Sequence, residues 1–199
     1  MSDQDIFEFH AIVAAEPATL RAWQHEPAAA SWARHYLVGG GHTLALVSAR
    51  RIELTRRRFV DGLRVEDELL RADLPLDGTA LDMIGRVLPP AIGTLKIDGR
   101  TAQRLVDSLA HPALRQASVL IKSQRMTRGP VSATVSTFEV PDWEATGRSI
   151  MLRSASATQL RAALDALRLA RLPDQPLSDW LRKAHRAATA DAGPRTRAA

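Results

Sequence analysis

Hydrophobic and polar residues alternate with a period of two over much of the chain, and this pattern predicts β-strands. Alternating segments lie at residues 5–13, 42–48, 51–59, 63–70 and 148–154, and a short strand is expected within 93–100. An Asp-Gly pair at 61–62 indicates a hairpin turn. The clearest hairpin spans 117–140, where two alternating runs flank Gly129-Pro130. The sequence therefore predicts seven or eight strands in antiparallel pairs.

Other segments repeat their apolar residues every three or four positions, or carry helix start and stop signals, and these predict helices. Helices are expected from Glu16-Pro17 to residue 23, at 27–37 before the glycines at 39–41, at 77–88, at 101–116, at 156–172 and, for one or two turns, at 176–184. Thr79 is the expected N-cap of the third, which Pro89-Pro90 ends, and Ser156 or Thr158 caps the fifth. Together with the strands, this predicts an α+β fold whose antiparallel sheet is barrel-like, with peripheral helices.

Charge lies on one face of several predicted strands. Arg51, Glu53, Thr55 and Arg57 share a face by period two, and Glu8 and His10 share a face of the first strand. Such a face either lies in water on the outside of a sheet, or lines a barrel with a polar interior. The alternation alone leaves both interpretations open.

Composition narrows the class of protein. A chain of 199 residues with 45% hydrophobic content is expected to form one domain, here 1–183, followed by a disordered basic tail at 184–199. The chain contains no cysteine, no apolar run of membrane-spanning length and a polar first segment, which favour a cytoplasmic protein without a membrane partner. The net charge of +5 lies mostly beyond Arg182, and the four tryptophans are scattered, so no specific nucleic-acid partner is expected.

Several short motifs follow one another in a meaningful order. The first strand reads "IFEFHAIV" and precedes "AAEPATLRAW"; later come "LTRR" at 54–57, "RVEDE" at 64–68, "LIKSQR" with Lys122 and Arg125, and "STFEV" with Glu139. A final helix precedes "LSDWL" at 177–181. In this order, the chain resembles the CYTH, or triphosphate tunnel, family, over roughly residues 5–183.

The resemblance implies a tunnel in which basic residues bind a triphosphate and acidic residues bind a divalent metal. The residues carried over as phosphate-binding are Arg57, Arg64, Lys122, Arg125 and His10, and those carried over as metal ligands are Glu8, Glu66, Glu68 and Glu139. If the protein is catalytic, the metal is expected to be Mg²⁺ or Mn²⁺, and the reaction metal-dependent hydrolysis of a phosphoanhydride, as in a triphosphatase hydrolase.

The chain also departs from the family pattern. Ile6 stands where the family has an acid, His10 replaces a lysine, and "SIMLRS" lacks the usual acids. The basic residues are therefore better preserved than the acidic ones. This leaves two functions open: binding of triphosphate, polyphosphate or a nucleoside triphosphate, with or without hydrolysis, or a catalytically inactive interaction module that binds a protein partner.

Overall fold

The computed structural model describes residues 5–38, 40–90, 92 and 96–191 of the chain. Within these residues, nine β-strands form one antiparallel sheet, and eight of them close into a barrel in the order β1-β6-β5-β4-β3-β7-β8-β9, with β9 pairing back to β1 and β2 pairing to β7 as an extra strand. The strands are β1 (Phe7–Ile12), β2 (Gln24–His25), β3 (Ala29–Tyr36), β4 (His42–Val47), β5 (Arg51–Val60), β6 (Leu63–Asp73), β7 (Gln116–Arg128), β8 (Val131–Val140) and β9 (Ala145–Ser154). The predicted antiparallel barrel in an α+β chain is confirmed.

The described α-helices are α1 (Gly78–Val87), α2 (Ala102–Ser108), α3 (Ala157–Ala166) and α4 (Leu177–Asp191), and short 3-10 helices occur at η1 (Ala18–Ala22) and η2 (Pro141–Trp143). Three of the four α-helices begin at a side-chain cap. Asp77, Thr101 and Ser156 each accept a hydrogen bond from the backbone N–H three residues later. Asp77 rather than Thr79 therefore caps α1, whereas the expected cap Ser156 is confirmed.

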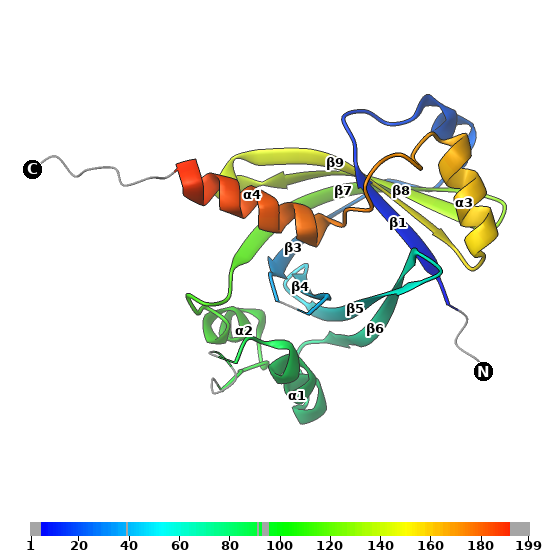
Figure 1. Cartoon of the computed structure of the whole chain (residues 1–199). Helices are drawn as coiled ribbons and strands as arrows, with labels where there is room; N and C mark the ends of the chain where they lie inside the picture. The colour runs from blue at the N-terminus through cyan, green and yellow to red at the C-terminus, as the bar shows by residue number, and fades with distance from the viewer. Residues whose placement is uncertain (1–4, 39, 91, 93–95, 192–199) are drawn as a thin grey trace, which may run out of the picture.

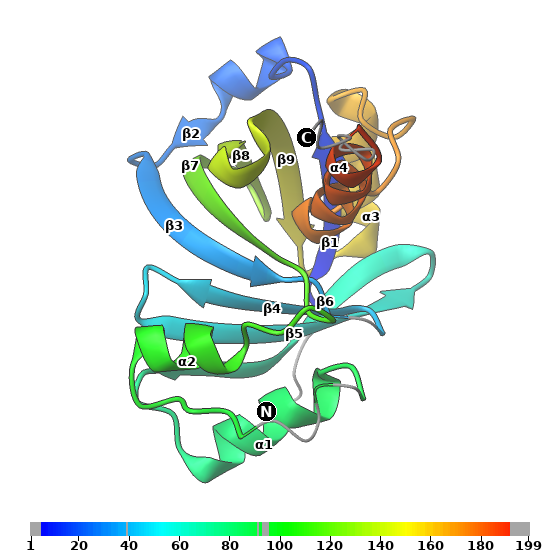
Figure 2. The ribbon, with the colours of Figure 1, turned by 90° about the vertical axis from the view of Figure 1, so that its left-hand side faces the viewer.

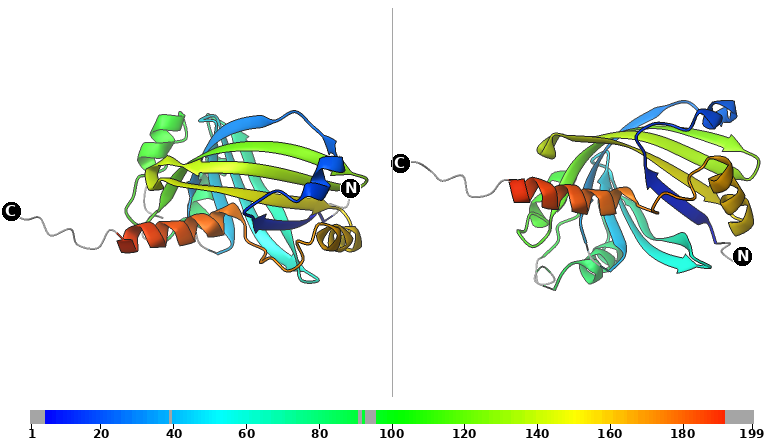
Figure 3. Two further views of the ribbon diagram at one scale, coloured as in Figure 1. Left: turned by 90° about the horizontal axis from the view of Figure 1, so that it is seen from above. Right: turned by 45° about the horizontal axis from the view of Figure 1, so that its top comes forward.

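Two helical layers cover separate parts of the outer barrel surface. Helices α1 and α2 lie against β4, β5 and β6, where Leu44, Ile52 and Leu54 are buried beneath them (Figure 1). Helix α3 and η1 cover β1, β8 and β9 on another side, over a core that includes Phe9 and Leu152 (Figure 2). Helix α4 lies across one end of the barrel, as the views in Figure 3 also show.

The alternation along each strand decides which side chains face the barrel interior. On β1, Phe9 and Ala11 pack into the outer core with α3, so Glu8 and His10 lie on the opposite, inner face. On β5, Ile52 and Leu54 face outward, so Thr55 and Arg57 face inward. The charged faces predicted from the sequence are therefore faces of the barrel interior.

Three local predictions were wrong. Residues 27–37 were expected to be helical because they are rich in alanine, yet Ala29–Tyr36 form β3, which closes the barrel between β4 and β7. This is a tertiary override of helix propensity, since every residue of Ala29–Tyr36 pairs with the distant strand β7. The strand expected within 93–100 is absent from the described residues 96–100, and 93–95 lie outside the described residues. Finally, α4 continues to Asp191, so a disordered tail starting at 184 is wrong for 184–191, and 192–199 lie outside the described residues.

Candidate functional site

Glu8 is the most buried carboxylate of the described inner face, with 1% of the residue exposed. One of its oxygens accepts hydrogen bonds from Arg153 on β9, and the other lies 3.1 Å from Nε2 of His10. Burial pushes the pKa of Glu8 upward, but the hydrogen bond to His10 and the charge of Arg153 outweigh it and lower the pKa to about 2. Glu8 is thus held ionised inside the barrel.

Glu66 on β6 lies next to this pair. It accepts a hydrogen bond of 2.8 Å from Oγ1 of Thr55, its neighbour on β5. Burial raises the pKa of Glu66, and the negative charge of Glu8 raises it further. One ligand atom from each of Glu8, His10 and Glu66 lies within 4.8 Å of the other two. These three residues, which we call the Glu8 cluster, could hold a divalent cation, because two carboxylates forced together gain from a positive charge between them.

Two inner-face arginines lie opposite members of the Glu8 cluster on neighbouring strands. Arg57 donates to both carboxylate oxygens of Asp179 on α4, at 2.7 and 3.5 Å, and Arg64 donates to Asp174 at 2.5 Å. Arg64 is only 1% exposed, and its Nε has no hydrogen-bond partner among the described residues. A buried guanidinium with a spare N–H can donate a further hydrogen bond to an anion oxygen.

The C-terminal segment that supplies these aspartates is anchored to β1. The backbone N–H of His10 donates to Asp174 at 2.8 Å, and the N–H of Gln175 donates to the carbonyl of His10 at 2.7 Å. On α4, Arg182 donates to Asp179 at 2.7 Å and to the carbonyl of Val38. The C-terminal segment, although it is not part of the barrel strands, therefore supplies polar groups that bond to residues of the barrel interior.

The side of the inner face formed by β7 and β8 has a different character. Ala117, Val119, Phe138 and Val140 form a buried cluster there with Leu181 of α4. Trp180 packs edge-to-face on Phe138, with ring centroids 4.8 Å apart. The neighbouring inner-face histidine, His35, has both ring nitrogens buried without a described partner, and burial lowers its pKa to about 4, so it is neutral at neutral pH. This side offers packing rather than ionic chemistry.

Of the residues predicted from the sequence, Glu8, His10, Glu66, Arg57 and Arg64 come together on the inner face, and four others do not join them. Lys122 was expected inside the barrel, and this is wrong, because it lies on the outer face of β7 opposite Thr137, 60% exposed and 3.7 Å from Glu139. The expected metal ligand Glu139 shares this outer face. The exposed side chains of Glu68 and Arg125 pair instead with Arg71 and Glu26.

The sequence interpretation missed Arg153, Asp174 and Asp179. Arg153 could have been found from the alternation of β9, because Ile150 and Leu152 mark the outer face and place it on the inner one. Asp174 and Asp179 carried no such signal. They lie in and after a loop whose path across the barrel end is set by tertiary contacts alone.

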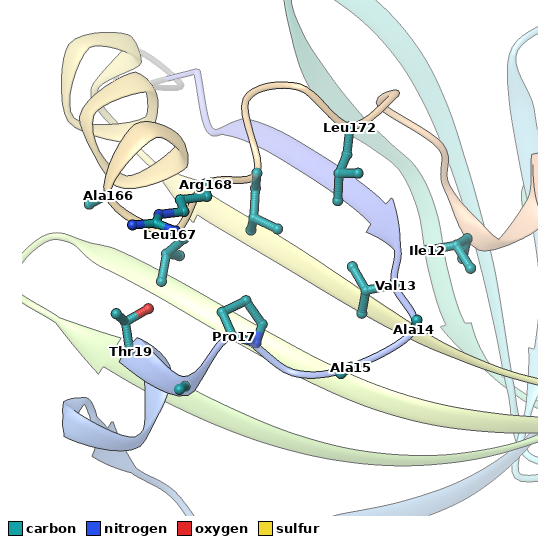
Figure 4. A pocket seen from close by; sticks show the side chains of 12 residues that line it. Ile12, Val13, Ala14, Ala15, Pro17, Thr19, Ala166, Leu167, Arg168 and Leu172 are labelled. Carbon is teal, nitrogen blue, oxygen red and sulfur yellow. The ribbon is translucent and has the colours of Figure 1, made fainter.

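A surface pocket of 590 Å³ lies outside the barrel, between the segment after β1 and the loop after α3 (Figure 4). Its lining is mostly apolar, with Val13, Pro17, Leu167 and Leu172 around it and Arg168 at its edge. The lining includes no carboxylate and no imidazole. This pocket therefore offers neither of the groups from which the Glu8 cluster is built.

No protein-family model matches the chain, and no curated protein matches it. Two solved structures are similar: a candidate adenylate cyclase from Bacillus halodurans (9% identity, TM-score 0.49, covering 89% of this chain and 97% of that chain) and a candidate adenylyl cyclase from Hippeastrum with a dominant triphosphatase activity (11% identity, TM-score 0.45, covering 91% and 88%). At such low scores, the fold and the site rest on the strand order and contacts described above.

Among the described residues, every helix falls short of the length and apolarity that a membrane span requires.

Proposed function

We propose that the inner face of the barrel binds a phosphate-rich anion, such as triphosphate or polyphosphate, together with a divalent cation. The observation that carries this proposal is that Arg57 and Arg64 each hold a carboxylate on the inner face, through the same N–H groups that bind phosphate oxygens. Without the C-terminal segment, the described inner face presents Arg57, Arg64 and Arg153 against Glu8 and Glu66. A cation at the Glu8 cluster would make this surface strongly attractive to a polyanion.

The Glu8 cluster fits a divalent cation in its donor set. Two carboxylates supply the oxygen ligands that Mg²⁺ and Mn²⁺ prefer, and the imidazole of His10 is a ligand that suits Mn²⁺ better than Mg²⁺. When bound, such a cation would neutralise phosphate charge and lower the pKa of a bound water. The protein's own contribution would be to orient the anion through Arg57 and Arg64.

Binding is tested by titration calorimetry with tripolyphosphate, with and without Mn²⁺. Arg57→Ala is expected to weaken binding by about tenfold or more, because a charged hydrogen-bond donor is lost. Lys122→Ala is the matched control, since it also removes one cation but from the outer face. An equal loss in both variants, or no binding by the wild type at millimolar ligand, would contradict the proposal.

The Glu8 cluster also favours a second function, metal-dependent hydrolysis of the bound phosphoanhydride with water as the nucleophile. It is tested by phosphate release from tripolyphosphate and ATP with Mg²⁺ and with Mn²⁺. Glu66→Gln should abolish the metal-dependent part of the release, while Glu68→Gln, an exposed change on the same strand, should leave it unchanged. Absence of release with either cation would leave a receptor for the anion, and binding of a protein partner that survives Arg57→Ala would favour an interaction module.

A further inference from the structure

The two inner-face arginines are already occupied by carboxylates from a single short stretch of the chain. Asp174 lies in the loop before α4 and Asp179 in the first turn of the helix. The retention of Asp174 by the N–H of His10, next to the Glu8 cluster, brings this stretch to the site where we propose the anion binds. An anion and these carboxylates would therefore compete for the same guanidinium groups.

The strength of this internal competitor differs at its two ends. Asp179 is 30% exposed and shares its carboxylate between Arg57 and Arg182. Burial pushes the pKa of Asp179 upward, but the hydrogen bond from Arg57 and the surrounding positive charges lower it overall. Asp174 instead pairs with Arg64, which is almost fully buried. Release of Asp179 is the easier step, because both partners regain water, whereas release of Asp174 needs a replacement anion at once.

Resting on the proposed function, we propose that Asp174 and Asp179 are specificity-determining residues that act as an internal competitor for the anion. A ligand with several linked phosphoryl groups can replace both carboxylates, and so compensates the charges of both Arg57 and the buried Arg64. A single phosphate can replace only one and leaves the other pair holding the segment in place. The site thereby selects polyphosphate chains over orthophosphate.

The test measures the affinity of tripolyphosphate and of orthophosphate for the wild type, Asp179→Asn and Asp174→Asn by calorimetry, with folding checked by thermal unfolding. Asp179→Asn is expected to bind tripolyphosphate about three- to tenfold more tightly, although it unfolds at a lower temperature without ligand. Asp165→Asn is the matched control: it removes one exposed carboxylate from α3, has no ion pair among the described residues, and should change neither property.

The outcomes separate the two proposals. Equal or weaker tripolyphosphate binding by a folded Asp179→Asn protein, with normal binding by the wild type, would overturn the internal competitor and leave the proposed function standing. Orthophosphate binding to the wild type as tightly as tripolyphosphate would also overturn it. No binding by the wild type or by any variant would overturn both. Should Asp174→Asn fail to fold, Asp179→Asn alone decides the result, because its carboxylate is not the partner of the buried arginine.

Discussion

The two sides of the barrel interior hold the C-terminal segment by different kinds of contact. On the β7–β8 side, Phe138 and Val119 bury Leu181 of α4 in an apolar cluster. On the β1–β5–β6 side, the same C-terminal segment is held by ion pairs to Arg57 and Arg64. A dissolved ion cannot replace apolar contacts, whereas a dissolved anion can replace the carboxylate of an ion pair. The comparison teaches that one side holds the C-terminal segment by contacts that no anion can replace, whereas the other holds it by ion pairs for which an anion could compete.

The apolar cluster on the β7–β8 side can be disrupted by removing the ring of Phe138. Phe138 is 1% exposed, and Phe138→Ala is expected to lower the free energy of unfolding by about 3–5 kcal/mol through lost contacts and a cavity. Chemical denaturation monitored by fluorescence measures this. Phe59→Ala serves as the control, because Phe59 is 61% exposed and its removal should cost about 0.5 kcal/mol or less. Comparable losses in the two variants would show that the apolar cluster is not a core.

The ionic interactions of Glu8 on the charged side can be disrupted by lowering the pH. Because the pKa of Glu8 is lowered to about 2, its contribution to stability is fully present above the ordinary value of 4.5 and is lost as the pH falls from 4.5 towards 2. That contribution is on the order of 3 kcal/mol. Glu8→Gln should therefore be less stable than the wild type at pH 7, and the difference should shrink as the pH falls below 4.5. A stability difference that stays constant from pH 7 to pH 3 would contradict this role for Glu8.

The role of the charged side can be tested further by removing the repulsion between Glu8 and Glu66. The pKa of Glu66 is raised, so the folded protein binds that proton more tightly, and stability from this group falls as the pH rises above 4.5. Glu66→Gln keeps an acceptor for Thr55 and removes the charge beside Glu8, so we expect a gain in stability at pH 7.5 that shrinks as the pH falls to 4.5.

Thermal unfolding with and without Mn²⁺ completes this measurement. Glu66→Gln should also lose any stabilisation by the cation, since a ligand of the Glu8 cluster is gone. Glu68→Gln is the control, because its exposed carboxylate pairs only with exposed Arg71 among the described residues. Destabilisation by Glu66→Gln at neutral pH would show that the two carboxylates do not repel each other as described.

Much of the charged side was readable from the sequence because β-strands alternate with a strict period. The alternation puts Glu8 with His10, and Thr55 with Arg57, on one face of their strands. These faces line the barrel interior because helices cover the opposite faces of the same strands. The alternation could not place both Lys122 and Arg125 inside, because residues three positions apart lie on opposite faces of a strand. Val119 of β7 packs in the inner apolar cluster, so Lys122 lies on the outer face.

The sequence by itself determined the antiparallel strands, the Asp-Gly turn, the capped helix α3 and the shared strand faces of Glu8 with His10 and of Thr55 with Arg57, because these depend on local periodicity and turn chemistry. The tertiary structure alone decided that the alanine-rich segment at Ala29–Tyr36 is a strand and that Asp174 and Asp179 reach the inner-face arginines. Both outcomes depend on partners far away in the chain. The barrel can close only if this segment forms a strand, and a buried arginine is stable only beside a counter-charge. The local sequence of neither segment indicates that it fills this role.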